Sequence, residues 1–399
     1  MNTERLFYQD AYVREFDAQI LARQVVSGRP AVVLDRTAFY ATGGGQPNDL
    51  GVLSTSTEGP VKVLDVLAED GAIWHVLDSE LQGAGVHGTV DWDRRFDHMQ
   101  QHTGQHVLSQ AFFGECGAET VAFHLGERYS TIDLNRIDLA PAISGAESAA
   151  NAIVDAALPV IATFVTPKEL VQLPLRKPPK VTENIRVVQV TGFDWSACGG
   201  THVANTSQIG LIKVIGTERR GPELRVTFLC GRRARADYAR LKVLAQGLVA
   251  RYTAAEDEIL ELLDRRAADF DALRKDLVDL ERQWSASTAA ALWSKAEIRG
   301  GVHLVAAALD VGVDRARKVA QELRARSGVV ACLGVRGDRP QIIVTRSDDV
   351  TADSAQLLRM AVAAGGGRGG GRPDWAQGGV PTDEALDAAL DAVAQAFKD

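Results

Sequence analysis

Two short segments with the same internal spacing constrain this chain more than any other feature. The sequence HTGQH at 102–106 sets two histidines four residues apart, and CGGTH at 198–202 sets a cysteine and a histidine at the same interval. Residues four apart lie on one face of a helix, so the first pair can direct two imidazoles to one point. Within the second pair, two glycines favour a tight turn. The candidate metal ligands are His102, His106, Cys198 and His202.

Three imidazoles and one thiolate suit a tetrahedral zinc ion, whereas calcium and magnesium prefer oxygen ligands. A single histidine pair at this spacing arises by chance on many helices, but two matching pairs are much less expected by chance. We therefore predict one zinc ion per chain. His98 lies one helical step before His102, and we interpret it as an outer group of the site or as a competing ligand.

The composition is that of an ordinary globular chain. Its 399 residues are enough for two to four domains, and 46% of them are hydrophobic. The formal net charge of −8 argues against a non-specific nucleic-acid coat protein but allows a local basic patch. Four widely spaced cysteines do not match a secreted disulfide framework. Without a basic, apolar leader or a run of about 20 apolar residues, we expect a cytoplasmic protein with no membrane partner.

The sequence predicts an α+β protein with four domains. Residues 1–95 hold short apolar or alternating runs broken by glycine, aspartate and proline, which predict a small β-barrel. Residues 96–235 mix helices and strands around the two ligand pairs, which we interpret as an α/β sandwich containing the zinc site. In that domain Asp97 is the predicted N-cap of a helix that carries the first ligand pair and runs to Phe113.

Residues 236–298 form the third domain, in which apolar residues recur at helical spacing. From Phe270 to Trp284 the intervals alternate between three and four, which is the pattern of a coiled-coil seam. A helical hairpin, a spacer and a homodimer contact all fit this pattern. The last domain, residues 299–399, alternates strand and helix as a small α/β domain does, and it is a second candidate homodimer contact.

Basic residues of interest lie in two places. Arg219 and Arg220 begin a run of arginines after the second ligand pair and are candidates for phosphate contacts, with a solvated strand edge as the alternative. The segment GGGRGGGRPDWAQGG at 365–379 is too dense in glycine for a helix or strand and is predicted as a loop. Arg368 and Arg372 would bring positive charge to a bound polyanion there, and the ring of Trp375 could stack on a base or ribose. The alternative is a flexible low-complexity loop without a binding role.

Three segments, in this order, carry a resemblance to a known family. FYATGGGQPNDLG, DHMQQHTGQHVLSQAF and CGGTHVANTSQIGLIKV together resemble the editing half of alanyl-tRNA synthetase, and more narrowly the free-standing AlaX trans-editing proteins. The glycine-rich tail is similar to the C-Ala domain of the synthetase and of the long form of AlaX. The resemblance covers nearly the whole chain. Because the chain begins at the β-rich segment, we expect no aminoacylation domain and no activation of alanine.

The resemblance implies an aminoacyl-tRNA deacylase, an ester hydrolase that removes serine, and also glycine, from the tRNA for alanine. A pocket shaped for alanine cannot strongly reject glycine, or serine with its added hydroxyl, so a second hydrolytic site corrects the error. Residues 96–235 would then be the editing domain and residues 299–399 a C-Ala-like tRNA-binding domain. The candidates for gripping the aminoacyl group are the catalytic pair Thr42 and Gln46 and the backbone of Gly43, Gly44 and Gly45.

Several alternatives stay open from the sequence. Four protein ligands are typical of a closed, structural zinc site, but a zinc that admits water would activate it. A zinc-stabilised tRNA-binding module without chemistry is the main alternative function. The editing domain of threonyl-tRNA synthetase shares the paired spacing, but the FYATGGGQP segment and the tail favour the alanine family. A peptidase is disfavoured because no glutamate lies between His102 and His106.

Overall fold

The computed structural model describes residues 2–179 and 181–397, and the chain divides into two compact units, Met1–Leu248 and Val249–Asp399. Within the described residues, no helix combines the length and the apolar character that crossing a membrane requires.

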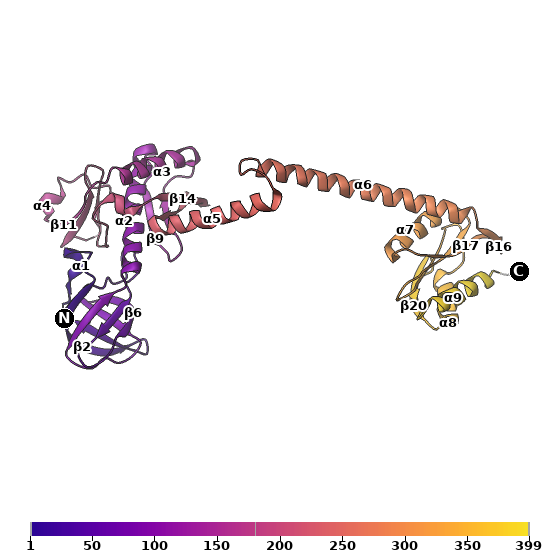
Figure 1. Ribbon diagram of the computed structural model, residues 1–399, viewed down its shortest axis with the longest axis horizontal. Coiled ribbons are helices and arrows are strands. Elements are labelled where there is room, and N and C mark those ends of the chain that lie inside the picture. Colours follow the sequence, from indigo (N-terminus) through magenta and orange to yellow (C-terminus); the bar gives the residue numbers. More distant parts are fainter. Residues whose placement is uncertain (1, 180, 398–399) are drawn as a thin grey trace. The chain divides into compact units, whose positions relative to one another are not determined.

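The first unit begins with a closed six-stranded barrel, which confirms the barrel predicted from the alternating apolar runs (Figure 1). In order around the barrel, the strands are β2 (Glu15–Val26), β3 (Arg29–Leu34), β7 (Ala72–Leu77), β6 (Val61–Glu69), β5 (Gly51–Ser54) and β8 (Gly85–Val90). All neighbouring strands pair antiparallel, and β8 closes the barrel on β2. Apolar side chains such as Phe16, Phe39 and Leu53 fill the interior.

Helix α2 (Trp92–Cys116) follows the barrel and is the central element of the first unit. Asp91 caps it by accepting a hydrogen bond from the backbone of Arg94, so the prediction that Asp97 is the cap is wrong. Asp97 lies inside the helix, where its carboxylate pairs with Arg233 at 2.6 Å. The helix is buried over most of its length, so the first ligand pair sits on a rigid element.

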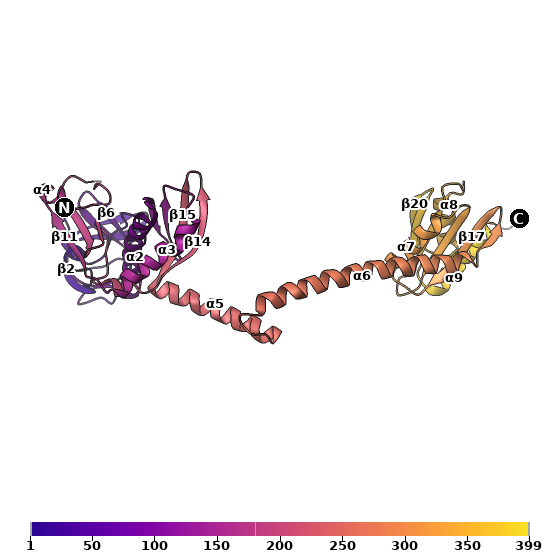
Figure 2. The same ribbon diagram turned by 90° about the horizontal axis from the view of Figure 1, so that it is seen from above.

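Two small sheets surround α2. One has four strands in the order β14 (Ile212–Arg220), β15 (Glu223–Cys230), β10 (Ser130–Leu134) and β9 (Thr120–Leu125). The other has the order β11 (Val160–Val165), β12 (Ile185–Val190) and β13 (Asp194–Ala197). Helix α3 (Ala140–Asp155) packs against α2, as Figure 2 shows, and both helices share a core with β10, β12 and β15. This arrangement holds the turn after β13 against α2.

The remaining short elements of the first unit connect these parts. They are β1 (Glu4–Arg5), α1 (Leu6–Gln9), β4 (Arg36–Thr37), α4 (Pro167–Leu170) and the 3-10 turn Thr206–Ile209. The segment predicted to be helical, residues 236–298, contains α6 (Ile259–Trp293) and most of α5 (Gly231–Tyr252), which begins before it. The seam residues Leu273, Leu277 and Leu280 of α6 are exposed, so the described residues bury no coiled-coil seam at these positions.

The second unit contains a six-stranded sheet with helices on both faces. The order is β16 (Glu297–Arg299), β17 (Val302–Leu309), β18 (Val329–Val335), β19 (Gln341–Arg346), β21 (Trp375–Gly379) and β20 (Arg368–Arg372). Helix α7 (Val313–Arg324) and the end of α6 share one apolar cluster with the sheet. Helices α8 (Ser354–Ala364) and α9 (Asp383–Gln395) share another cluster with it.

The glycine-rich segment of the second unit is not the predicted loop, because β20 and β21 form a hairpin from it. The glycines are needed where the strands and α8 approach closely. A Cβ on Gly371 would lie 2.3 Å from Cα of Ala376, and one on Gly369 would lie 2.5 Å from Cα of Gly378. Dense glycine here therefore indicates tight backbone packing rather than an irregular loop.

Candidate metal centre

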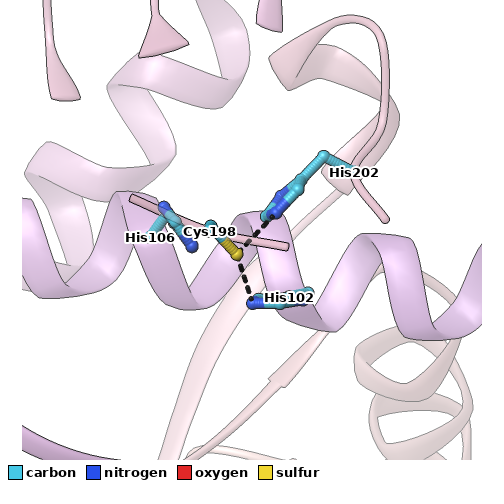
Figure 3. A group of neighbouring side chains, drawn as sticks. All are labelled: His102, His106, Cys198 and His202. Atoms are coloured by element: carbon cyan, nitrogen blue, oxygen red, sulfur yellow. Dashed lines mark hydrogen bonds between the residues drawn. The ribbon is translucent and has the colours of Figure 1, made fainter. Parts of the chain in front are cut away.

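The four predicted ligands come together at one point in the first unit. His102 and His106 come from α2, and Cys198 and His202 come from the turn after β13; their ligand atoms lie within 4.8 Å of one another (Figure 3). The Sγ atom of Cys198 is 3.4 Å from Nε2 of His102 and 3.3 Å from Nε2 of His202. His98 is not part of this cluster.

The donor set of three imidazoles and one thiolate fits a zinc ion, and so do two of the distances between ligand atoms. Zinc–nitrogen and zinc–sulfur bonds of ordinary length place neighbouring ligand atoms about 3.3 to 3.8 Å apart. The two sulfur–nitrogen distances lie in that range. The three imidazoles are buried, and Cys198 is half-buried.

Each imidazole is oriented by a partner on its other nitrogen. In every case Nδ1 contacts an oxygen atom, which leaves Nε2 free to point toward the centre. The partners are Gln46 Oε1 for His102 at 2.8 Å, Asp194 Oδ2 for His106 at 3.2 Å and Thr103 Oγ1 for His202 at 3.1 Å. Such partners fix the orientation of metal ligands, and no motif in the sequence predicts these three contacts.

Gly200 lets the ligand turn approach α2. A Cβ at this position would lie 2.2 Å from Cε1 of His102 and 2.9 Å from Oε1 of Gln46. The turn is also fixed from outside by Arg186, whose Nη1 donates to the carbonyl oxygens of Cys198 at 3.0 Å and Gly200 at 2.8 Å. Arg186 lies in an apolar strand sequence without a motif, so sequence reasoning missed it.

Burial, neighbouring charges and hydrogen bonds shift the pKa values of three of the ligands. Burial alone would raise the pKa of the Cys198 thiol, but His102 and His202 lower that pKa well below its usual value. Burial would lower the pKa of His106, but hydrogen bonds with Asp194 and Cys198 raise that pKa to about 9. Burial lowers the pKa of His202 to about 3. These shifts favour the thiolate form of Cys198 and the protonated form of His106.

We expect zinc binding to release the His106 proton, so zinc affinity rises with pH. Below pH 9 the metal-free imidazole is protonated and must lose its proton, which predicts a dissociation constant about tenfold smaller at pH 8 than at pH 7. Asp194→Asn removes the carboxylate that holds the proton and should flatten this dependence. Thr103→Val is the control, because it should weaken affinity about 10- to 100-fold without changing the slope. Competition with a chelator at pH 7 and pH 8 measures the zinc dissociation constants. If the constant changes with pH as much in Asp194→Asn as in the unmodified protein, the assignment of the proton to His106 and Asp194 is wrong.

The predicted substrate loop lies beside the metal centre. Gly44 and Gly45 have φ of 56° and 85°, which makes a tight turn closed by two backbone hydrogen bonds between Gly43 and Gln46. Gln46 is fully buried, and its amide contacts His102 and Thr201. Thr42 is exposed, and its Oγ1 accepts a hydrogen bond from the backbone of Asn48 at 3.1 Å. The structure therefore places Gln46 behind a ligand and Thr42 at the surface.

The predicted basic residues lie on strands of both units. Arg219 and Arg220 end the exposed part of β14, where Arg220 pairs with Glu218 at 3.2 Å. In the second unit, Arg368 and Arg372 begin and end the exposed strand β20. Trp375 is half-buried and packs against the apolar cluster under α7. Of the other arginines in the run after the second ligand pair, several pair with aspartates: Arg225 with Asp133, Arg232 with Asp93, Arg233 with Asp97 and Arg240 with Asp237.

Three family models match the chain. The model described as "Threonyl and Alanyl tRNA synthetase second additional domain" matches residues 185–225, which include the second ligand pair. The model described as "DHHA1 domain" matches residues 301–399, and that described as "tRNA synthetases class II (A)" matches residues 3–94.

Similar proteins come from archaea and bacteria. The alanine–tRNA ligase of Thermococcus kodakarensis is 31% identical over 98% of this chain, which spans only 43% of that ligase. The C-Ala domain of Aquifex aeolicus alanyl-tRNA synthetase aligns with 26% of this chain and 98% of that structure, at 23% identity and a TM-score of 0.25. The alanyl-tRNA editing protein AlaX-L of Pyrococcus horikoshii is 30% identical over 97% of this chain and 98% of its own length. Because that similarity extends over nearly the whole of both chains, this chain belongs to the AlaX-L family of alanyl-tRNA editing proteins.

Proposed function

We propose that this protein is a trans-editing hydrolase that deacylates Ser-tRNA(Ala) and Gly-tRNA(Ala) in the cytoplasm. The observation that carries the proposal is the contact of Gln46 Oε1 with His102 Nδ1 at 2.8 Å, since it joins the glycine loop directly to the four-ligand centre. The membership of the chain in the AlaX-L family supports the same activity.

The reaction is the hydrolysis of an ester. The oxygen of water bonds to the carbonyl carbon of the amino acid, and the bond from that carbon to the terminal ribose oxygen breaks. The products are the free amino acid and a tRNA with its ribose hydroxyl restored. A zinc ion bound at His102, His106, Cys198 and His202 would either acidify a water molecule or organise the pocket around the ester.

The chain's own residues hold the ester beside the centre. Cys198 is the half-buried member of the four ligands, so the acceptor end is proposed to approach from its side. Tyr40 donates from its hydroxyl to the carbonyl oxygen of Gly43 at 2.9 Å, which keeps the glycine turn in place. With Gln46 occupied behind His102, the exposed Thr42 hydroxyl and the turn's backbone remain to contact the aminoacyl group.

Thr42→Val should reduce the hydrolysis of Ser-tRNA(Ala) by about 2- to 10-fold, because the serine hydroxyl loses one neutral hydrogen bond. Gly-tRNA(Ala) serves as the matched substrate, since glycine has no hydroxyl and its hydrolysis should be unchanged. Deacylation rates with both substrates measure the effect. An equal loss for both would show that Thr42 does not read the side chain.

The decisive experiment compares deacylation of Ser-, Gly- and Ala-tRNA(Ala) by the zinc-loaded protein. Rapid loss of serine and glycine with alanine spared would support the proposal. Tight tRNA binding without hydrolysis would favour a zinc-stabilised tRNA-binding module. Hydrolysis of Ser-tRNA(Thr) with Ser-tRNA(Ala) spared would point to the threonine type of editing.

The second unit is proposed to bind the body of the tRNA and to contribute to a homodimer. Arg368 and Arg372 on the exposed strand β20 offer charge to phosphates, and Arg219 and Arg220 do so in the first unit. The exposed leucines of α6 support a homodimer contact within 236–298. Light scattering of the full chain tests whether a homodimer forms.

A further inference from the structure

An exposed aromatic residue lies on the sheet beside the metal centre. Phe164 on β11 is 52% exposed, and in the antiparallel pairing of β11 with β12 it lies directly opposite Arg186. Its ring meets the ring of Tyr8 edge to face, with centroids 5.6 Å apart and planes at 77°. Residues opposite each other on paired strands share one face of the sheet. Phe164 is therefore exposed on the same face that carries Arg186.

Tyr8 connects this exposed ring to the metal-ligand turn. A Cβ on Gly199, next to Cys198, would lie 3.4 Å from the Tyr8 hydroxyl. The guanidinium of Arg186 lies 5.4 Å from the Tyr8 ring centroid, and the same side chain donates to the carbonyl oxygens of Cys198 and Gly200. The aromatic pair is thus continuous with the half-buried side of the centre.

Positive charge accompanies the aromatic pair. Arg5 donates from Nη1 to the Tyr8 hydroxyl at 3.0 Å, and its guanidinium lies 5.5 Å from the Tyr8 ring centroid. Together with Arg186 it places two guanidinium groups beside the Tyr8 ring. Aromatic rings next to arginines are the combination with which proteins bind single-stranded nucleic acid, because bases stack and phosphates are attracted.

We propose that Phe164 and Tyr8 form a stacking platform for the terminal base of the tRNA acceptor end. This inference rests on the proposed deacylase function. The ester to be cleaved and the terminal base are attached to the same ribose, so a surface that stacks the base must lie within one nucleoside of the metal centre. The platform meets this requirement because the Tyr8 hydroxyl lies only 3.4 Å from the position that a Cβ on Gly199 of the ligand turn would take. It positions the substrate rather than taking part in the bond-breaking step.

The test uses uncharged tRNA(Ala) in which 2-aminopurine replaces the terminal adenine, because stacking quenches the fluorescence of this base. We expect quenching on binding to the zinc-loaded protein and to Phe164→Tyr, and little quenching with Phe164→Ala. Ile161→Ala is the matched control: Ile161 lies on the same strand, is 47% exposed and faces the opposite side of the sheet. It should behave as the unmodified protein does.

A kinetic measurement keeps the two proposals distinguishable. Phe164→Ala should raise the KM for Ser-tRNA(Ala) by about tenfold, within the range that base stacking contributes, with little change in kcat. Suppose that the unmodified protein hydrolyses Ser-tRNA(Ala), while Phe164→Ala still quenches the fluorescence fully and keeps its KM. That result would overturn the stacking platform and leave the proposed function standing. Failure of the unmodified protein to hydrolyse any mischarged tRNA would overturn the proposed function, and the quenching would still show whether the base stacks.

Discussion

Cys198→Ala is expected to lose zinc and deacylase activity together, each by at least about 100-fold. Loss of an outer partner of a metal ligand already weakens affinity about 10- to 100-fold, and loss of a ligand should exceed that. Cys198 is also the one anionic donor of the cluster, and Arg186 is held against the turn that carries it. Without the thiolate, the zinc ion would have only three neutral imidazole ligands and would lie near the positive charge of Arg186, so its binding would weaken.

Metal content by mass spectrometry, chelator competition and deacylation of Ser-tRNA(Ala) check this prediction. Cys116→Ala is the matched control, because Cys116 is also half-buried and its thiol donates only to the carbonyl oxygen of Phe112, at 3.1 Å. It should retain both zinc and activity. A Cys198→Ala protein that has lost zinc but still hydrolyses Ser-tRNA(Ala) at the usual rate would remove the metal from the proposed reaction.

The ligands could be predicted from sequence because their spacing is local. Four-residue periodicity on a helix and a glycine turn are properties of short segments, and the two pairs match each other. The groups that orient the ligands lie far away in the chain: Gln46, Asp194 and Thr103 are separated from their histidines by 56, 88 and 99 residues. No short-range pattern contains such pairs, so only the folded chain identifies them.

The errors in the fold prediction have a similar origin. Asp97 was predicted as the cap because an aspartate before a helical pattern is a common N-cap, but the backbone shows that Asp91 caps α2 while Asp97 pairs with Arg233. The glycine-rich tail was predicted as a loop because glycine lowers strand propensity in general. In the hairpin of β20 and β21 that rule is overridden, since any Cβ on Gly371 would collide with the neighbouring backbone.

Arg95→Met is expected to lower the free energy of unfolding of the first unit by about 3 to 5 kcal/mol, because it leaves a buried carboxylate without its counterion. Arg95 and Asp49 are fully buried and paired through two guanidinium nitrogens, with Nε 3.0 Å from Oδ1. Arg95 also donates to the carbonyl oxygen of Ala11 at 2.8 Å, so it ties α2 to the chain that enters the barrel.

Urea denaturation of the zinc-loaded protein, followed through the transition of the first unit, measures the loss. Arg240→Met is the control, because Arg240 pairs with Asp237 near the surface, where an ion pair contributes little. The double variant Arg95→Met with Asp49→Asn should recover part of the stability, since it removes the unpaired charge. Because Asp49 lies three residues after Gln46, the single variant should also weaken zinc binding by displacing Gln46 from His102. Stability within about 1 kcal/mol of the unmodified protein would contradict the assignment of Arg95 as the buried link between α2 and the glycine loop.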